Sequence, residues 1–194
     1  DVGWRQENNV WYFKYPDGNY IKNNWLLWNS KWYLFDNSGK MLTGWQQKDG
    51  PWYYFDTSYG GMKTGWLKEG DKWYYLNPNQ GGPEGAMISN CWLTISGKTY
   101  FINQSGVMME GWYQVSGKWY YLDESGQGYM YTGWLDLNGQ WYYLNAYGSM
   151  LTGWINVKGT WYYMDASGAM CTGWKQIAGT WYYLHSGGNM AIGW

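Results

Sequence analysis

The chain has 194 residues, of which 19 are Trp, 22 Tyr and 29 Gly against only 4 Phe, and this unusual composition indicates internal repetition. Its 13 Lys and Arg against 14 Asp and Glu give a formal charge of −1, which argues against binding of a polyanionic nucleic acid. The sequence has no apolar run of about 18 residues, and its N-terminus lacks the features of a secretory signal. We therefore expect a soluble chain that has no membrane span and starts within mature sequence.

Tryptophans that open similar segments recur every 20 to 22 residues, with one longer step of 26 residues. A period of this length is typical of solenoids and arrays, in which each unit packs mainly against its neighbours. We predict a single repeat module over residues 1–194, with an irregular connection at residues 77–92. The predicted repeats open at Trp4, Trp25, Trp45, Trp66, Trp92, Trp112, Trp134, Trp154 and Trp174, and Trp194 begins a truncated tenth.

The segment from residue 151 to 170 shows what one repeat encodes. Trp154 and Trp161 flank Lys158-Gly159, a dipeptide suited to a tight turn, so the segment predicts a β-hairpin with Val157 opposite Thr160. Because side chains alternate along a strand, each face of the hairpin holds its own set of residues. The expected faces are Trp154, Trp161 and Tyr163 on one side, and Ile155, Val157, Tyr162 and Met164 on the other. A lone hairpin is marginally stable, so the hairpins must stack.

The same pattern runs through the chain and predicts an all-β protein. A second Trp follows the first by seven residues in every repeat except the fifth, which has Thr99 at that place. The next residue is Tyr in all nine repeats, which fits a packing role, whereas the residue after it varies. The second Trp positions are Trp11, Trp32, Trp52, Trp73, Trp119, Trp141, Trp161 and Trp181.

Three aromatic rings on one exposed face suggest an aromatic cage, which attracts a quaternary ammonium group through the faces of its rings. Stacking of sugars is the main alternative use, and cross-strand packing is a purely structural alternative. A packing role would tolerate Phe, Leu or Val, and none of these replaces Trp at the paired positions. Repetition therefore favours a ligand-binding face.

Other chemistry is poorly supported by the sequence. Four aspartates occupy one place in the repeat, but Asn or His stands there in other repeats, so we interpret this place as a turn. His185 is the only histidine, and no catalytic set, metal-ligand cluster or phosphate-binding loop occurs, so we expect neither catalysis nor a metal or cofactor. Cys91 and Cys171 lie four repeats apart and are expected to be free thiols. The turn residues are Asp36, Asp56, Asp123 and Asp165, with Asn77, Asn103, Asn145 and His185 at the same place in four other repeats.

The repeated pattern TGW-x5 or x6-WYYLD-x-x-G-x-M resembles the cell-wall-binding repeat of the choline-binding proteins of streptococci and their phages. The resemblance covers essentially the whole chain and rests on many linked positions. It implies a left-handed β-hairpin solenoid. It also implies choline sites between consecutive hairpins, with two Trp from one hairpin, a third aromatic residue from the next and often a Met nearby.

Mapped onto this chain, the resemblance implies five well-furnished choline sites. Met residues at the junctions serve either as lips of these sites or as gap-fillers between hairpins, and both roles can hold. Thr99 should abolish the site of its own hairpin, Trp4 and Trp11 meet Leu34, and Trp174 and Trp181 have only Trp194 beyond them. The expected sites are Trp25 and Trp32 with Tyr54, Trp45 and Trp52 with Tyr75, Trp112 and Trp119 with Tyr143, Trp134 and Trp141 with Tyr163, and Trp154 and Trp161 with Tyr183; the expected lips are Met41, Met62, Met130, Met150 and Met170.

The function implied by the resemblance is non-catalytic binding to choline on teichoic or lipoteichoic acid of a Gram-positive cell wall. The chain would lie outside the cell and anchor a larger surface protein or wall hydrolase. The segment starts at DVGW and stops within a repeat, so we expect it to be part of a longer chain. A glucan-binding repeat module is the alternative, and a structural spacer or adhesin stalk is a third possibility. The sequence sets no oligomeric state.

Overall fold

The computed structural model describes residues 2–79 and 83–193, and within these ranges it contains 18 strands and no helix. Each strand pairs only with its neighbour in the chain, which gives nine two-stranded antiparallel hairpins. The predicted all-β class and hairpin repeat are therefore confirmed. The left-handed turn of the stack and the assignment of residues 1–194 to a single module stay predictions.

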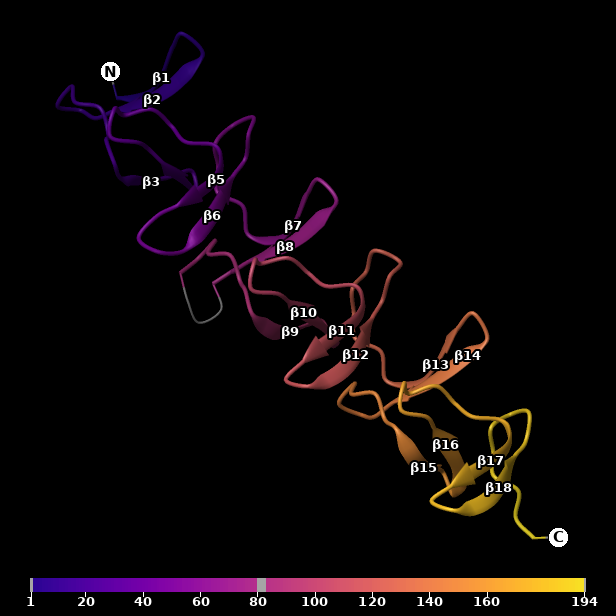
Figure 1. Ribbon diagram of the computed structural model, residues 1–194. Helices are drawn as coiled ribbons and strands as arrows, with labels where there is room; N and C mark the ends of the chain where they lie inside the picture. The colour runs from indigo at the N-terminus through magenta and orange to yellow at the C-terminus, as the bar shows by residue number, and fades with distance from the viewer. Residues whose placement is uncertain (1, 80–82, 194) are drawn as a thin grey trace. The chain divides into compact units, whose positions relative to one another are not determined.

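The hairpins fall into two compact units, each of which holds successive hairpins (Figure 1). The first unit comprises Asp1–Cys91 and Ile102–Met108, and the second comprises Trp92–Phe101 and Met109–Trp194. The first unit contains the pairs β1 (Gly3–Glu7) with β2 (Val10–Lys14), β3 (Trp25–Trp28) with β4 (Lys31–Leu34), β5 (Gly44–Gln47) with β6 (Trp52–Phe55), and β7 (Gly65–Glu69) with β8 (Lys72–Leu76).

The remaining hairpins lie in the second unit, apart from the two end residues Cys91 and Ile102 of the first pair, which belong to the first unit. They follow the same order of strand, tight turn and strand. Their bounds are β9 (Cys91–Ile95) with β10 (Lys98–Ile102), β11 (Gly111–Val115) with β12 (Lys118–Leu122), β13 (Gly133–Leu137) with β14 (Gln140–Leu144), β15 (Gly153–Val157) with β16 (Thr160–Met164), and β17 (Gly173–Ile177) with β18 (Thr180–Leu184).

The turn between β15 and β16 explains why these short strands pair. Lys158 and Gly159 both have positive φ, 50° and 87°, which is the geometry of a two-residue turn that matches the twist of a hairpin. The Gly159 N–H also donates a hydrogen bond to Asn156 Oδ1 at 2.9 Å. Val157 lies opposite Thr160, and Trp154 opposite Tyr163, so the register predicted from the sequence is confirmed for this hairpin.

The face that carries Ile155 and Met164 is buried by stacking, as predicted. The exposed fraction of the Ile155 side chain is 6%, and that of Met164 is 0%. The residues three positions after the second Trp form a fully buried row. In this row Phe35 packs on Trp4, the opening Trp of the preceding hairpin, with ring centroids 5.8 Å apart. The row consists of Phe35, Phe55, Leu76, Ile102, Leu122, Leu144, Met164 and Leu184.

One backbone hydrogen bond recurs between neighbouring hairpins. Each junction Met follows one hairpin, and its N–H donates to the carbonyl oxygen at the second Trp position of the hairpin before that one. Met170, for example, follows β16 and donates to Trp141 on β14 at 2.8 Å. This bond fixes the spacing of the stack, because it satisfies backbone groups that no strand partner reaches. The donor and acceptor pairs are Met41 and Trp11, Met62 and Trp32, Met87 and Trp52, Met108 and Trp73, Met130 and Thr99, Met150 and Trp119, Met170 and Trp141, and Met190 and Trp161.

The junction Met side chains also fill space between repeats. A Cβ added to Gly168, whose φ is +85°, would clash with the sulfur of Met150, and the same contact recurs at other junctions. Only glycine leaves room for the thioether there and adopts this backbone conformation without strain. The geometry therefore supports the gap-filling role of these methionines.

The shared aspartate place is a turn, as interpreted from the sequence. Asp165 Oδ1 accepts hydrogen bonds from the N–H groups of Ser167 and Ala169 at 2.8 and 3.1 Å. Asn145 Oδ1 accepts two bonds from the equivalent N–H groups, so a neutral amide performs the same task. The irregular connection keeps the backbone bond that closes this turn, since the Asn77 N–H donates to the Ala86 carbonyl at 2.8 Å, as the Asp165 N–H donates to the Ala169 carbonyl at 2.8 Å. Residues 80–82 of that connection lie outside the described residues.

Candidate functional site: aromatic cages between hairpins

Two tryptophans on one face of a hairpin meet a tyrosine from the next hairpin. Trp25 on β3 and Trp32 on β4 lie edge to face, with ring centroids 6.2 Å apart and an interplanar angle of 86°. Tyr53 on β6 lies 5.0 Å from Trp25 at 76°. The three rings line a cavity of about 320 Å³, into which Met62 also faces. We call this arrangement the Trp25/Trp32 cage and name the others in the same way.

The cage geometry recurs in both units. Cavities of about 300 and 320 Å³ are lined by the same residue types at the Trp4/Trp11 and Trp134/Trp141 cages. In five other hairpins that have both Trp residues, the ring centroids of the opening Trp and of the Tyr from the next hairpin lie 4.7 to 5.1 Å apart. These pairs are Trp4 with Tyr33 at 4.8 Å, Trp45 with Tyr74 at 4.9 Å, Trp112 with Tyr142 at 5.1 Å, Trp134 with Tyr162 at 4.7 Å, and Trp154 with Tyr182 at 4.8 Å.

The third ring is not the one expected from the sequence. Tyr54 was expected beside Trp25, but its ring contacts the opening Trp of its own hairpin, Trp45, at 5.2 Å. The structure places Tyr53, one residue earlier, in the cage. The other four expected rings shift in the same way: Tyr75 contacts Trp66 at 5.0 Å, Tyr143 contacts Trp134 at 5.0 Å, Tyr163 contacts Trp154 at 5.1 Å, and Tyr183 contacts Trp174 at 5.3 Å.

Strand alternation is the physical reason for this shift. Tyr53 and Tyr54 are neighbours on β6, so their side chains point to opposite faces of the hairpin. Tyr54 shares its face with Trp45 of the same hairpin, while Tyr53 points back to the preceding one. The signal was present in the sequence, because the invariant Tyr had already been assigned to the stacking face. That Tyr both packs the stack and forms a wall of the cage.

The same correction brings the first hairpin into the set. The sequence placed Leu34 next to Trp4 and Trp11, which argued against a cage there. In the structure Tyr33 lies 4.8 Å from Trp4 and lines the cavity with Trp11 and Met41.

Each of the three described cage cavities is bordered by a junction methionine. Met41, Met62 and Met170 line the cavities of the Trp4/Trp11, Trp25/Trp32 and Trp134/Trp141 cages. Met150 is bonded through its N–H to the carbonyl of Trp119, and Met130 to that of Thr99, where the second Trp is missing. Met87 and Met190 hold the same place at Trp52 and Trp161, although the sequence-based set of lips omitted them.

In five pairs the opening Trp is half-buried and the second Trp is exposed, namely Trp11, Trp52, Trp119, Trp141 and Trp161, whereas Trp25 and Trp32 are both half-buried. Trp161 is 43% exposed, whereas Trp154 is half-buried beneath it. In the Trp25/Trp32 cage, burial and, to a smaller extent, the charge of Asp49 raise the pKa of Tyr53, so its phenol stays neutral at ordinary pH. Where the second Trp is exposed, as at Trp161, a ligand meets ring faces that are open to solvent, which is the environment that favours an ammonium ion bearing apolar methyl groups.

The hairpin with Thr99 departs from the cage geometry at one wall. Trp92 and Tyr120 keep the ring contact at 4.7 Å. At the place of the second Trp, the hydroxyl of Thr99 lies 3.0 Å from that of Thr94. The two threonine hydroxyls replace an aromatic wall, so this hairpin keeps the contact between Trp92 and Tyr120 but lacks the ring of the second Trp.

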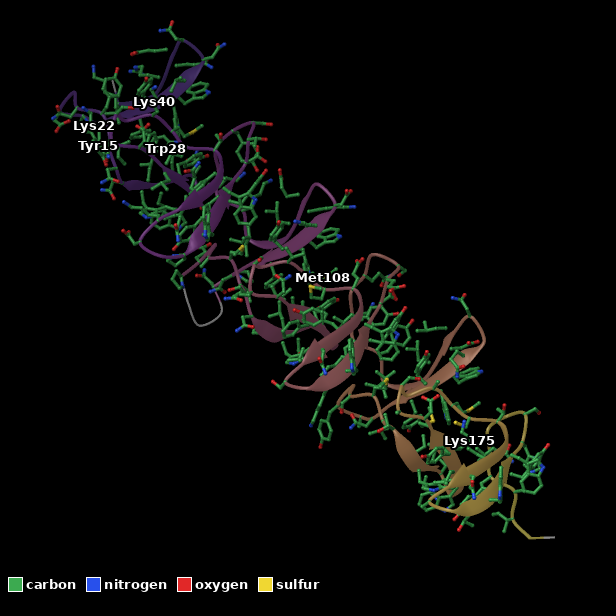
Figure 2. The ribbon with its side chains drawn as sticks, viewed as in Figure 1. Tyr15, Lys22, Trp28, Lys40, Met108 and Lys175 are labelled. Carbon is green, nitrogen blue, oxygen red and sulfur yellow. The ribbon has the colours of Figure 1, made fainter. Side chains whose placement is uncertain are left out.

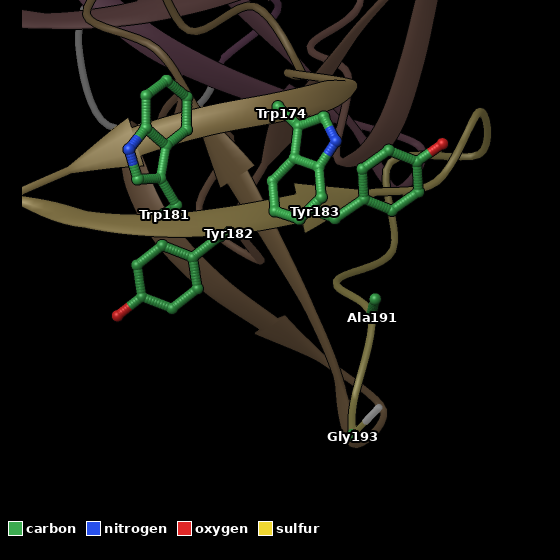
Figure 3. A pocket seen from close by; sticks show the side chains of 6 residues that line it. All are labelled: Trp174, Trp181, Tyr182, Tyr183, Ala191 and Gly193. Atoms are coloured by element: carbon green, nitrogen blue, oxygen red, sulfur yellow. The ribbon is translucent and has the colours of Figure 1, made fainter.

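The hairpin β17/β18 presents an open version of the arrangement. Trp174 and Trp181 line a depression with Tyr183 and Ala191 (Figure 3). Tyr182 also borders the depression, but its ring points to the other side of the hairpin from that of Trp181 (Figure 3). Its ring contacts Trp154 of the preceding hairpin. Trp194, the residue expected beyond this pair, lies outside the described residues.

Two further exposed aromatic residues of the first unit lie outside the cages. Trp28 and Tyr15 are labelled in Figure 2. Their ring centroids lie 5.0 and 6.1 Å from that of the buried Phe13. Each is 37% exposed. They cover the ring of Phe13 on the first hairpin, and the sequence did not predict a role for them.

Other kinds of site are not indicated by the described residues. In residues 2–79 and 83–193, no group of three or more His, Cys, Asp or Glu side chains could hold a metal ion. No helix in these ranges has the length and hydropathy needed to cross a membrane. Cys91 and Cys171 are free thiols, as expected.

Comparison with known proteins decides the family. The model of the choline-binding repeat matches residues 24–64, 42–92, 88–130 and 131–172, and the model of a cell wall binding repeat matches residues 2–20 and 172–190. The chain belongs to the choline-binding repeat family. No curated protein sequence matches it.

Solved structures of choline-binding proteins share the fold. Choline binding protein F of Streptococcus pneumoniae, crystallised with a peptidoglycan analogue, has 36% identity and a TM-score of 0.79 over 94% of this chain and 70% of its own. The choline-binding domain of CbpL from the same species has 26% identity and a TM-score of 0.71 over 100% and 99%. The modular autolysin LytC of this species has 25% identity and a TM-score of 0.59, and the match covers 99% of this chain but 48% of LytC.

Proposed function

We propose that the cages bind the trimethylammonium group of choline. The observation that carries this proposal is the recurring cavity of about 300 to 320 Å³ walled by two Trp and one Tyr, because three ring faces attract a quaternary ammonium that offers no hydrogen bond. The revised sites pair Trp25 and Trp32 with Tyr53, Trp45 and Trp52 with Tyr74, Trp112 and Trp119 with Tyr142, Trp134 and Trp141 with Tyr162, and Trp154 and Trp161 with Tyr182; Trp4 and Trp11 with Tyr33 form a further site.

Each cage should bind choline weakly. A desolvated cation–π contact contributes about 2 kcal/mol, and ordering costs offset part of the sum over three rings. A net binding free energy near −4 kcal/mol corresponds to a dissociation constant on the order of 1 mM. A single cage is therefore too weak to hold a protein on a surface.

Repetition supplies the retention. A polymer that carries many choline groups engages several cages at once, and effective concentration raises avidity by roughly 10²–10⁴ over one site. The natural polymer of this kind is choline-bearing teichoic or lipoteichoic acid, which fits the match to a cell wall binding repeat. The segment itself acts without catalysis and without a metal or cofactor, at the outer surface of a Gram-positive cell, where it anchors a larger protein such as a wall hydrolase.

Titration with choline tests the binding step. Tryptophan fluorescence should saturate in the millimolar range, and the melting temperature should rise with choline concentration because only the folded chain binds. An absence of both responses at tens of millimolar choline contradicts the proposal.

A second experiment separates choline recognition from recognition of a polysaccharide. The chain should bind a polymer bearing phosphocholine groups and be released by free choline, while the same polymer bearing phosphoethanolamine serves as the matched control. Binding to dextran that choline does not displace would instead support the alternative of a glucan-binding module.

A further inference from the structure

The cages share their rings but differ at one outer position. Beyond the two Trp, the Tyr and the Met, each of the three described cavities is bordered by a turn that lies two hairpins further along the chain. The residue before the glycine of that turn is Tyr59 at the Trp4/Trp11 cage, Glu84 at the Trp25/Trp32 cage and Gly187 at the Trp134/Trp141 cage. We call this the rim position.

The irregular connection supplies the rim residue of the Trp25/Trp32 cage. Pro83 and Glu84 both line its cavity, and the backbone of the turn is held by the bond from the Gly85 N–H to the Asn77 carbonyl at 2.7 Å. Glu84 is partly buried. Among the described residues it has no ion-pair partner, since the ion pair found there joins Lys63 to Asp56. The insertion thus places an acidic residue, with no ion-pair partner among the described residues, at the border of an aromatic cage.

The other two rims lack this charge. At the Trp4/Trp11 cage the ring of Tyr59 has two cations over it, because Lys31 Nζ lies 4.5 Å and Lys63 Nζ 5.3 Å from its centroid. At the Trp134/Trp141 cage the rim residue is Gly187, which has no side chain. The three cages therefore present similar walls with different electrostatic surroundings.

We propose that Glu84 makes the Trp25/Trp32 cage a charge-selective ammonium site, distinct from cages that recognise choline mainly through ring faces and shape. The inference rests on the proposed choline-binding function and assigns a specificity-determining residue within it. A carboxylate a few ångströms from a bound cation, in a solvent-accessible cavity, strengthens binding of the cation by about threefold and leaves a neutral ligand of the same shape unaffected. Salt weakens this contribution, because the cavity is open to solvent.

The test compares choline with its uncharged carbon isostere, 3,3-dimethylbutan-1-ol, at individual cages of the full chain. The indole N–H signals of Trp32 and Trp141, assigned by Trp32→Phe and Trp141→Phe, report the two cages in separate NMR titrations. The preference for choline over the isostere should be about threefold larger at Trp32 than at Trp141, and 0.5 M NaCl should reduce this difference.

Two variants make the test reciprocal. Glu84→Gln should lower the preference at Trp32 to the value at Trp141 and leave Trp141 unchanged. Gly187→Glu should raise the preference at Trp141, and the position accepts a side chain because an added Cβ meets only Asn189 Oδ1, at 3.4 Å. The rise at Trp141 supports the proposal even if Glu84→Gln disturbs its own turn.

The outcomes distinguish this inference from the proposed function. If choline saturates both cages with equal preference and neither variant changes it, the role of Glu84 is overturned while choline binding stands. If choline shifts neither indole signal, the proposed function fails and the inference with it.

Discussion

The hairpins β9/β10 and β15/β16 have the same scaffold but differ in one wall of the cage. Both have a two-residue turn at positive φ, and both have an opening Trp that meets the Tyr of the next hairpin, at 4.7 Å for Trp92 and 4.8 Å for Trp154. At the second Trp position, however, one has Thr99 and the other Trp161. The bond from the junction Met is kept in both, since Met130 donates to Thr99 and Met190 to Trp161.

The comparison separates residues that stack hairpins from residues that bind a ligand. The opening Trp, the following Tyr and the Met bond persist where the second Trp is lost, so stacking does not require the second Trp. Trp161 is 43% exposed, which is a poor use of a large ring if packing were its only task. We therefore propose that the second Trp serves mainly to bind the ligand.

The largest expected effect comes from converting the complete hairpin into the incomplete one. Trp161→Thr should abolish choline binding at this cage, since loss of a ring wall worth about 2 kcal/mol weakens a millimolar site by roughly 30-fold. The hairpin should still fold, as the one with Thr99 does, with a loss of stability of about 1–2 kcal/mol from the reduced apolar burial. Calorimetric choline stoichiometry and thermal unfolding measure the two effects, and unchanged stoichiometry in the folded variant would contradict the account.

The reverse change should create a site. Thr99→Trp adds a third ring to Trp92 and Tyr120, and Met130 is already bonded at that position. The choline stoichiometry of the chain should rise by one, with a dissociation constant on the order of 1 mM. Thr99→Val is the matched control, because it also removes the hydroxyl that contacts Thr94 but adds no ring.

The smallest effect is expected at the turn, where the two hairpins also differ. The hydrogen bond from the Ser167 hydroxyl lowers the pKa of Asp165 against the opposing effect of burial, and Asn103 occupies the same place after β10. A carboxyl whose pKa is lower in the folded state stabilises the fold above about pH 4, and this contribution is lost as pH falls through the folded pKa. Asp165→Asn should lower the melting temperature at pH 7 by only about 1 °C and weaken its decrease on acidification. An equal acid dependence in both proteins would refute this role.

Most of the repeat could be predicted from the sequence because the determinants are local. The Lys158-Gly159 turn and the alternation of Trp154, Ile155 and Val157 fix the register and the two faces of a hairpin. The alignment of the repeats also predicts that Cys91 and Cys171 lie too far apart to form a disulfide, and that the place shared by the aspartates is a turn. These features depend on a few neighbouring residues.

The identity of the third ring depended on how one hairpin faces the next. Tyr182 and Tyr183 are both aromatic, and composition cannot distinguish them, but alternation places only Tyr182 on the face toward Trp154. The rim residues come from still further away, two hairpins along the chain, so Glu84 could not be assigned to the Trp25/Trp32 cage from the repeat pattern. Contacts between repeats were the part that required the structure.

A pair of neighbouring substitutions tests the central claim that cages are closed by the invariant Tyr of the next hairpin. During choline titration, the indole N–H signal of Trp161 should lose its saturable shift in Tyr182→Ala and keep it in Tyr183→Ala. Tyr182→Phe, which retains the ring, should bind as the unmodified chain does. Loss of binding in Tyr183→Ala with retention in Tyr182→Ala would contradict the account.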